Sequence, residues 1–254
     1  MSLDARRKNQ LIDQFVDFTQ SNSSVAKNFL LLARWDLEVA INEYLAYQQP
    51  PNASRKDKKS ILAIFDEYKD EEDKIGIDGT LRFIEDLGYE PEDRAVLALA
   101  EFLESPSVGV FPRKNFLSKW QSVNATTIEA MKQYVDQLDK RLITDPDYLK
   151  KVYKFTFGFL LEDGQKTLPL ETAIAYWDLL LAPVYGAKVG IWCDFLNESW
   201  KRAISRDTWN MFYVFLQDWD KDPELKLYDE EAAWPSLIDE FVEHVHDDSD
   251  KSKD

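Results

Sequence analysis

The chain is poor in cysteine, histidine and glycine, and each scarcity argues against a class of protein. Its 254 residues include one cysteine, Cys193, which excludes an internal disulfide and is typical of a reducing compartment. The eight glycines form neither a GxGxxG nor a Walker A pattern, so a phosphate-binding loop is not expected. Both histidines, His244 and His246, lie beside an acidic terminal stretch, where a catalytic triad or a metal site of fixed geometry is improbable.

Long apolar runs are missing as well. No segment approaches the roughly 18 consecutive apolar residues of a membrane-spanning helix. Residues 1–10, MSLDARRKNQ, have no apolar core of a signal peptide and no glycine at position 2 for myristoylation. These features predict a soluble intracellular protein, cytoplasmic and nuclear, that is not held in a membrane.

Positive charge is the third scarcity. Lys and Arg number 31 against 47 Asp and Glu, which gives a net charge of −16. This balance disfavours nucleic acids and anionic membranes as partners and favours basic proteins. Residues 218–254 hold 14 of the acids and only four lysines. For most of these acids a solvated face and an acidic tail are a sufficient interpretation.

What the chain does contain is apolar and aromatic residues at helical spacing. Hydrophobic residues make up 44%, with eight Trp, 11 Tyr and 15 Phe, enough for a sizeable core. The periodicity predicts an all-α fold, with Ser23 and Asp36 candidate helix caps and short β pairing expected only at 75–77 and 108–111. The domains that we expect are a three-helix module at 8–48, a linker at 49–59, a larger helical domain at 60–246 and a disordered acidic tail at 247–254.

An acidic loop between two predicted helices, within 68–88, suggests calcium. With Ile77 at the hydrophobic eighth position of an EF-hand loop, Asp70 stands first, but Lys74 takes a ligand position and the closing Glu is missing. A second candidate at 160–173 is poorer in acids. We therefore predict degenerate EF-hand-like helix–loop–helix units without a metal, and a calcium-responsive adaptor remains an alternative.

Two acids near the carboxyl end stand at the edges of apolar helix faces. Asp207 falls in the first turn of one predicted helix, and Asp239 lies one turn into another, which Ala233, Trp234 and Pro235 open. Carboxylates beside a small residue suit a docking patch for a basic partner. An ordinary acid favoured by a helix dipole and a solvated helix face are the competing interpretations, and physical reasoning alone leaves them open.

Few residues of the chain fit a catalytic role. Cys193 lies in an apolar segment, GIWCDFLNESW, so a buried structural thiol is expected rather than a nucleophile. With 47 acids, no single carboxylate pair argues for glycoside chemistry, although an enzyme with an unrecognised carboxylate site stays an alternative.

Several long segments resemble the defective-in-cullin-neddylation family, whose cullin-binding domain is also called the PONY domain. The likeness covers most of 60–245 and is carried by YKDEEDKIGIDG (68–79), FTFGFLLEDGQKTLPLETAIAYWDLLL (155–181), RDTWN (206–210) and YDEEAAWPSLIDEFV (228–242). The first module is similar to the family's ubiquitin-associated (UBA) domain through RWDLEVAINEYL (34–45), whereas FTQSNSS (18–24) replaces the Met-Gly-aromatic loop of many such domains.

The resemblance implies two binding sites. Asp207, Ala233 and Asp239 match the family's patch for the basic carboxyl-terminal winged-helix region of a cullin. An apolar pocket is implied for the acetylated N-terminal methionine of a neddylation conjugating enzyme, and Thr80 stands where relatives can carry a larger aliphatic residue. The matching pocket positions, which would otherwise be read as ordinary core, are Ile77, Pro91, Val96, Leu99, Ala100, Phe111, Phe159, Tyr176 and Leu179.

The implied function is that of a scaffold-type co-ligase that promotes cullin neddylation without catalysing a covalent step. Its implied partners are the cullin, the conjugating enzyme, the cullin-associated RING protein and, through the UBA-like module, ubiquitin. No cofactor or metal is implied. The alternative is a ubiquitin- or calcium-responsive adaptor that does not promote ligation.

Overall fold

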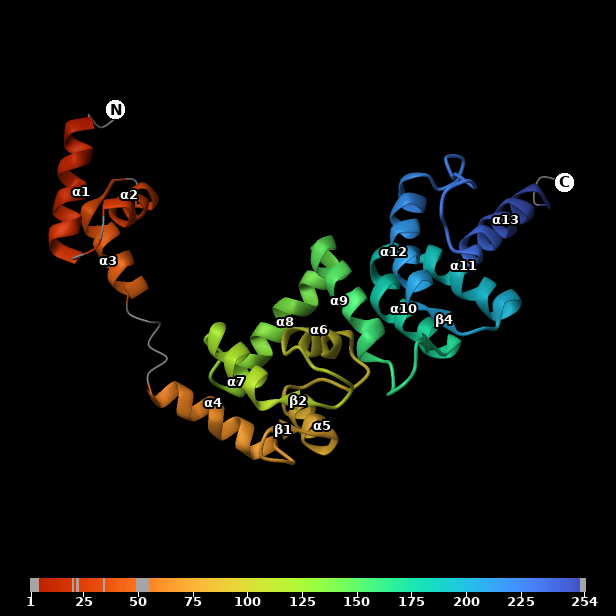
Figure 1. Ribbon diagram of the computed structural model, residues 1–254, viewed down its shortest axis with the longest axis horizontal. Coiled ribbons are helices and arrows are strands. Elements are labelled where there is room, and N and C mark those ends of the chain that lie inside the picture. Colours follow the sequence, from red (N-terminus) through yellow and green to blue (C-terminus); the bar gives the residue numbers. More distant parts are fainter. Residues whose placement is uncertain (1–4, 20, 22, 34, 49–54, 252–254) are drawn as a thin grey trace. The chain divides into compact units, whose positions relative to one another are not determined.

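The computed structural model describes residues 5–19, 21, 23–33, 35–48 and 55–251, and these residues are predominantly helical (Figure 1). The predicted all-α class is confirmed. The chain divides into two compact units, 1–60 and 61–254. Within the described residues, no helix is both long and apolar enough to cross a membrane.

The first unit contains three short helices, as the spacing predicts: α1 (Ala5–Thr19), α2 (Ser23–Leu32) and α3 (Leu37–Gln48). Phe15 and Leu30 are fully buried between them, and the Phe15 and Tyr44 rings meet edge to face at 5.2 Å. The cap predicted at Asp36 is confirmed, because its carboxylate accepts hydrogen bonds from two amides in the first turn of α3, both at 3.1 Å. Ser23, the other predicted cap, is itself the first residue of α2.

The larger unit begins with two helix–loop–helix segments. These are α4 (Arg55–Tyr68), which belongs to the larger unit from residue 61 onward, β1 (Lys74–Ile75) and α5 (Ile77–Asp86), followed by α6 (Arg94–Phe102), β2 (Phe111–Pro112) and α7 (Arg113–Ser122). The two loops pair through an antiparallel ladder of two residues on each side, with Ile75 opposite Phe111. This pairing overlaps the predicted one. Phe83, Phe116 and Trp120 fill the space between these helices with edge-to-face contacts.

The rest of the larger unit repeats that scheme. It comprises α8 (Ile128–Thr144), α9 (Pro146–Phe159), β3 (Thr167–Leu168), α10 (Leu170–Tyr185), α11 (Ala187–Phe195), the π-helix η1 (Leu196–Trp200), β4 (Ile204–Ser205), α12 (Arg206–Lys221) and α13 (Ser236–Lys251). Strand β3 pairs with β4, an antiparallel contact that the sequence does not predict. Each loop-to-loop ladder fixes the starts of the helices that follow it. The EF-hand likeness of these units stays a prediction.

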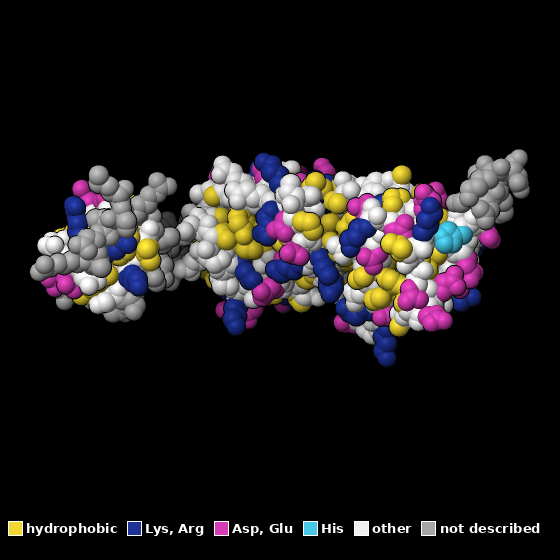
Figure 2. Space-filling view, turned by 90° about the horizontal axis from the view of Figure 1, so that it is seen from above, with side chains coloured by type: hydrophobic (Ala, Val, Ile, Leu, Met, Phe, Trp, Pro, Cys, Tyr) yellow, Lys and Arg dark blue, Asp and Glu magenta, His cyan; other side chains and the backbone are white. Residues whose placement is uncertain are grey.

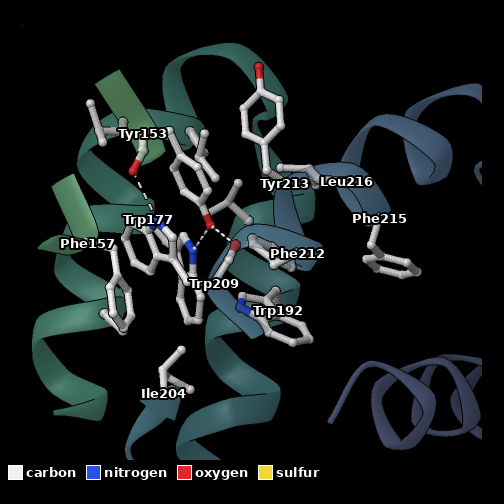
Figure 3. Packing of buried hydrophobic residues seen from close by; sticks show 14 of the residues in the cluster. Tyr153, Phe157, Trp177, Trp192, Ile204, Trp209, Phe212, Tyr213, Phe215 and Leu216 are labelled. Atoms are coloured by element: carbon white, nitrogen blue, oxygen red, sulfur yellow. Dashed lines mark hydrogen bonds between the residues drawn. The ribbon is translucent and has the colours of Figure 1, made fainter. Parts of the chain in front are cut away.

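The core of this half is built on α9, α10 and α12 (Figure 3). The Tyr153 ring stacks on Trp209 at 4.5 Å, and Trp209 stacks on Trp177 at 5.2 Å. The Tyr153 hydroxyl donates to the Trp209 carbonyl oxygen at 2.6 Å and accepts from Trp177 Nε1 at 2.8 Å. Because both polar groups are paired inside an aromatic stack, the first turns of α12 are held in one position.

Two expected boundaries differ from the structure. Helix α4 begins at Arg55, inside the predicted linker, and α13 continues to Lys251, so it includes the first five residues of the tail predicted to be disordered from 247. Both segments are charged and have few apolar side chains to bury, so their composition favours disorder. Once a helix is nucleated by its packed part, each further residue adds a hydrogen bond at small cost. Residues 49–54 and 252–254 of these segments lie outside the described residues.

Candidate functional site

The first predicted patch residue lies at the start of α12. Ser205 caps this helix, its Oγ accepting from the Thr208 amide at 3.1 Å. Asp207 follows in the first turn and its side chain is exposed. A carboxylate here is favoured by the exposed amides of the helix N-terminus and still faces solvent, where a cationic side chain can reach it.

The other two patch residues lie at the start of α13. Ile238 and Phe241 are fully buried, as the periodicity predicts, which leaves Asp239 half-buried at the rim, and Ala233 exposed. The Tyr228 hydroxyl donates to Asp239 Oδ1 at 2.5 Å. Burial, and then this carboxylate, raise the pKa of Tyr228, so the phenol stays a neutral donor.

One face of α12 runs from Asp207 toward the contacts that this helix makes with the start of α13. Asp207, Met211 and Phe215 are spaced by four residues and therefore lie close together around the helix, over about 12 Å of its length. Phe215 contacts Trp234 and Phe241 edge to face at 6.0 and 5.9 Å, so the start of α13 packs against α12 (Figure 1). We call Asp207, Ala233 and Asp239 the α12–α13 patch.

A second set of predicted residues gathers around a cavity of about 100 Å³, which we call the α5–α6 cavity. Its walls come from α5, α6, β2, α9 and α10, segments that are far apart in the sequence. Seven of the nine predicted positions line it: Pro91, Val96, Ala100, Phe111, Phe159, Tyr176 and Leu179. Burial, and then the charge of Glu92, raise the pKa of Tyr176, which keeps this wall uncharged.

The two remaining predicted positions do not line the cavity. Leu99 is fully buried on the other side of α6, in the core with Phe83, because adjacent residues of a helix point about 100° apart and Ala100 already faces the cavity. Ile77 is 65% exposed and lies beside Gly109 at the rim. The loop passes this close because Gly109 has no side chain: a Cβ there would lie 2.8 Å from Ile77 Cγ1, and its φ of +74° also favours glycine.

Four apolar wall residues were not predicted: Leu81 and Ile84 of α5, Leu97 of α6, and Val108 of the loop between α6 and β2. The two α5 residues have a signal in the sequence, because positions 77, 80, 81 and 84 follow helical spacing. This spacing indicates that they share one face of the helix, but it does not show that the face borders a cavity. Thr80, on this face, is only 5% exposed, and its hydroxyl has no hydrogen-bond partner within the described part of the chain.

The loop weighed for calcium uses its first carboxylate for another purpose. Asp70 Oδ2 accepts from the Gly76 amide at 2.7 Å and the Gly79 amide at 3.0 Å, so it caps the start of α5. Lys74, on a would-be ligand position, pairs with Glu71 at 3.0 Å. Among the residues that the structure describes, no three His, Cys, Asp or Glu side chains are grouped as metal ligands.

The single thiol is buried, as the sequence indicates. Cys193 is 8% exposed, and burial raises its pKa to about 12, with the charges of Asp178 and Asp194 adding to the effect. The neutral thiol is a poor nucleophile, so the geometry favours a structural role. What the described surface offers is acids at the starts of α12 and α13 and a cavity with mostly apolar walls, which suit recognition of other proteins.

Comparison with known proteins matches two family models to this chain. A model described as "Cullin binding" matches residues 130–244, and one described as "UBA-like domain" matches residues 9–51. Three similar proteins are each named "Defective in cullin neddylation protein 1". The protein of Yarrowia lipolytica is 40% identical over 93% of this chain and 96% of its own length. That of Candida albicans is 37% identical (94% and 98%), and that of Saccharomyces cerevisiae is 30% identical (96% and 96%).

Proposed function

The chain belongs to the defective-in-cullin-neddylation family, and from this premise we propose that it is a non-catalytic scaffold that promotes cullin neddylation. The observation that carries the proposal is the coexistence, in one compact unit, of an acidic docking patch and an apolar cavity. Two recognition surfaces on one unit suit a protein that holds two partners together.

The α12–α13 patch binds the basic carboxyl-terminal winged-helix region of a cullin in this proposal. Charge complementarity supports it, since Lys or Arg of the partner pairs with Asp207 and Asp239 while the small Ala233 lets the partner approach. The hydrogen bond from Tyr228 fixes the Asp239 carboxylate before binding. A carboxylate that is already ordered loses less entropy when the partner arrives.

The α5–α6 cavity binds the acetylated N-terminal methionine of the neddylation conjugating enzyme. Its walls are predominantly apolar, and acetylation removes an ammonium charge that would be costly to bury. A volume of about 100 Å³ is small for this group, so the rim residues Leu81 and Val108, 44% and 58% exposed, move outward on binding. Exposed rim residues have few neighbours to displace.

The scaffold accelerates transfer by proximity. Holding the cullin and the charged conjugating enzyme together, alongside the cullin-associated RING protein, limits the orientations of the thioester and the acceptor lysine. No side chain of this protein takes part in the covalent step, which agrees with its single buried thiol. The UBA-like unit adds ubiquitin as a proposed partner, with Phe18 (67% exposed) a candidate contact. We also propose that the protein works in both cytoplasm and nucleus.

The patch assignment is tested by reversing one rim charge. Asp239→Arg places a cation against the basic partner, so binding to an isolated cullin carboxyl-terminal domain, measured by calorimetry, is abolished. Glu171→Arg is the matched control, because it makes the same charge change at an exposed residue in the first turn of α10 and leaves the affinity unchanged. Undiminished affinity of Asp239→Arg contradicts the assignment.

The cavity assignment is tested with two peptides of the conjugating-enzyme N-terminus that differ only in acetylation. The acetylated peptide binds at least about tenfold more tightly, because the free amine carries its charge into an apolar site. Fluorescence polarisation measures both affinities, and equal values refute the assignment. A reconstituted neddylation assay with and without this protein then tests the scaffold role itself.

A further inference from the structure

A third concave surface lies next to the α12–α13 patch and belongs to neither proposed site. It is a cleft of about 350 Å³ between the carboxyl-terminal half of α12 and the connecting loop 222–235, here called the α12 cleft. Three aromatic rings form the largest part of its apolar lining. Tyr228 stacks on Trp234 at 5.9 Å, and Phe215 meets both edge to face at 6.1 and 6.0 Å.

The loop that closes the cleft is built from successive turns. Asp222 accepts from the Leu225 amide through its carbonyl at 3.0 Å and from the Leu227 amide through its carboxylate at 2.7 Å. Further along, the Ala232 amide donates to the Asp229 carbonyl at 3.2 Å. Leu225 is buried under the loop, whereas Leu227 is 86% exposed. The cleft is therefore formed before any ligand arrives, with a large aliphatic side chain exposed at its edge.

The charges around the cleft are mostly negative. Asp218, Asp222 and Asp229 border it, and the one cation among its described lining residues, Lys221, is paired with Asp218 at 3.2 Å. Figure 2 shows acidic side chains gathered with hydrophobic ones at the end of the larger unit that carries the histidines. An aromatic wall inside an acidic rim attracts an apolar side chain with basic neighbours and repels anions.

The cleft is continuous with the patch. Tyr228 lines the cleft with its ring and donates to Asp239 with its hydroxyl, and Trp234 lines the cleft directly after Ala233. A partner segment whose basic side chain pairs with Asp239 is therefore separated from the cleft only by the Tyr228 side chain. We propose that the α12 cleft is a second subsite for the cullin, which inserts one large apolar side chain next to the basic residues held by the patch. This inference rests on the proposed function.

The test fills the cleft without changing its charge. Ala232→Trp adds a large side chain at an exposed lining residue, and the full-length variant is measured by calorimetry against an isolated cullin carboxyl-terminal domain. We expect an affinity about tenfold lower than that of the unmodified protein, because a buried apolar anchor loses its place. Ala63→Trp, at an exposed residue of α4, is the matched control and leaves the affinity unchanged.

A second variant covers the case in which Ala232→Trp disturbs the loop. Leu227→Ser removes exposed apolar surface without adding bulk, and it lowers the affinity several-fold while the melting temperature stays the same. Full affinity in both variants, with Asp239→Arg still unable to bind, overturns the subsite and leaves the proposed function standing. Equal weakening by Ala63→Trp overturns it too. If the unmodified protein does not bind the cullin domain, the proposed function fails and the subsite with it.

Discussion

Replacing Gly79 by alanine tests whether the first turn of α5 is packed as closely as the structure shows. A Cβ at this position would lie 1.8 Å from the Tyr68 carbonyl oxygen and 2.8 Å from Ile75 Cγ2. The first of these atoms belongs to the backbone at the end of α4, which cannot rotate away as a side chain would. Helix α5 must therefore shift, and the shift strains the hydrogen bonds that Asp70 accepts from the amides of Gly76 and Gly79.

The expected magnitude follows from two opposing effects. Alanine in place of glycine inside a helix stabilises by about 0.5–1 kcal/mol. Overpacking costs about 1–3 kcal/mol, sometimes more, and a backbone obstacle places Gly79 at the upper end of that range. The net loss is about 2 kcal/mol in the free energy of unfolding. For a unit of this size that lowers the melting temperature by about 4–8 °C.

Gly190 provides the matched control. It lies in α11, and a Cβ there meets no atom within 4 Å, so only the helical preference remains. Gly190→Ala therefore stabilises by about 0.5–1 kcal/mol. Urea unfolding followed by tryptophan fluorescence reports on the larger unit, which holds seven of the eight tryptophans. Shifts of the same sign in both variants, or an unchanged Gly79→Ala, refute the packing argument.

The same substitution also affects recognition. Thr80, Leu81 and Ile84 follow Gly79 on α5 and line the α5–α6 cavity. A displaced α5 changes the shape of that wall, so Gly79→Ala also weakens binding of the acetylated peptide at temperatures where the protein remains folded. Gly190→Ala leaves the peptide affinity as it is.

Two further predictions concern buried groups. Tyr153→Phe removes the acceptor of Trp177 Nε1 and the donor to the Trp209 carbonyl oxygen. We expect urea titrations to show a free energy of unfolding lower by about 1–3 kcal/mol. An unchanged midpoint contradicts the role of these two hydrogen bonds in stability. The pKa of Cys193 is raised to about 12 in the folded chain, against about 8.5 unfolded, so the unfolded chain loses this proton first. The contribution of this thiol to stability is therefore complete below pH ~8.5 and declines as the pH rises toward 12. We expect the urea midpoint to fall less steeply with pH over that window in Cys193→Ala than in the unmodified protein. An equally steep fall in both proteins contradicts the raised pKa of Cys193.

The helices were predictable because their burial repeats along the sequence. In α13, Ile238 and Phe241 are buried at helical spacing, which indicates a helix. Asp36 stands one residue before α3 and caps it, which indicates where that helix begins. The pairing of β1 with β2 overlaps the one expected from the sequence, whereas β3 and β4 carry no such pattern. Two residues such as Thr167 and Leu168 are too few for an alternation, and their partners lie more than 30 residues away.

The cavity was only partly predictable. A family resemblance assigns positions and does not measure the direction in which each side chain points. Leu99 and Ala100 are neighbours in α6, yet one faces the core and the other the cavity. The α12 cleft was not predictable at all, because turns in an irregular loop bring Asp222 and Leu227 together without any periodic signal.

The two proposed surfaces are connected through one packed core. Tyr176 lines the α5–α6 cavity, and the next residue, Trp177, contacts Trp192 edge to face at 5.6 Å. Trp192 in turn contacts Phe241 at 5.0 Å, two residues from Asp239 in the patch. Close-packed interiors transmit displacement, so the spacing between the two surfaces is set by this row of rings. Proximity accelerates a reaction only when the partners are held in a narrow range of orientations. Replacing Trp192 by a smaller residue therefore weakens the binding of both partners, whereas a substitution on one surface weakens the binding of one partner only.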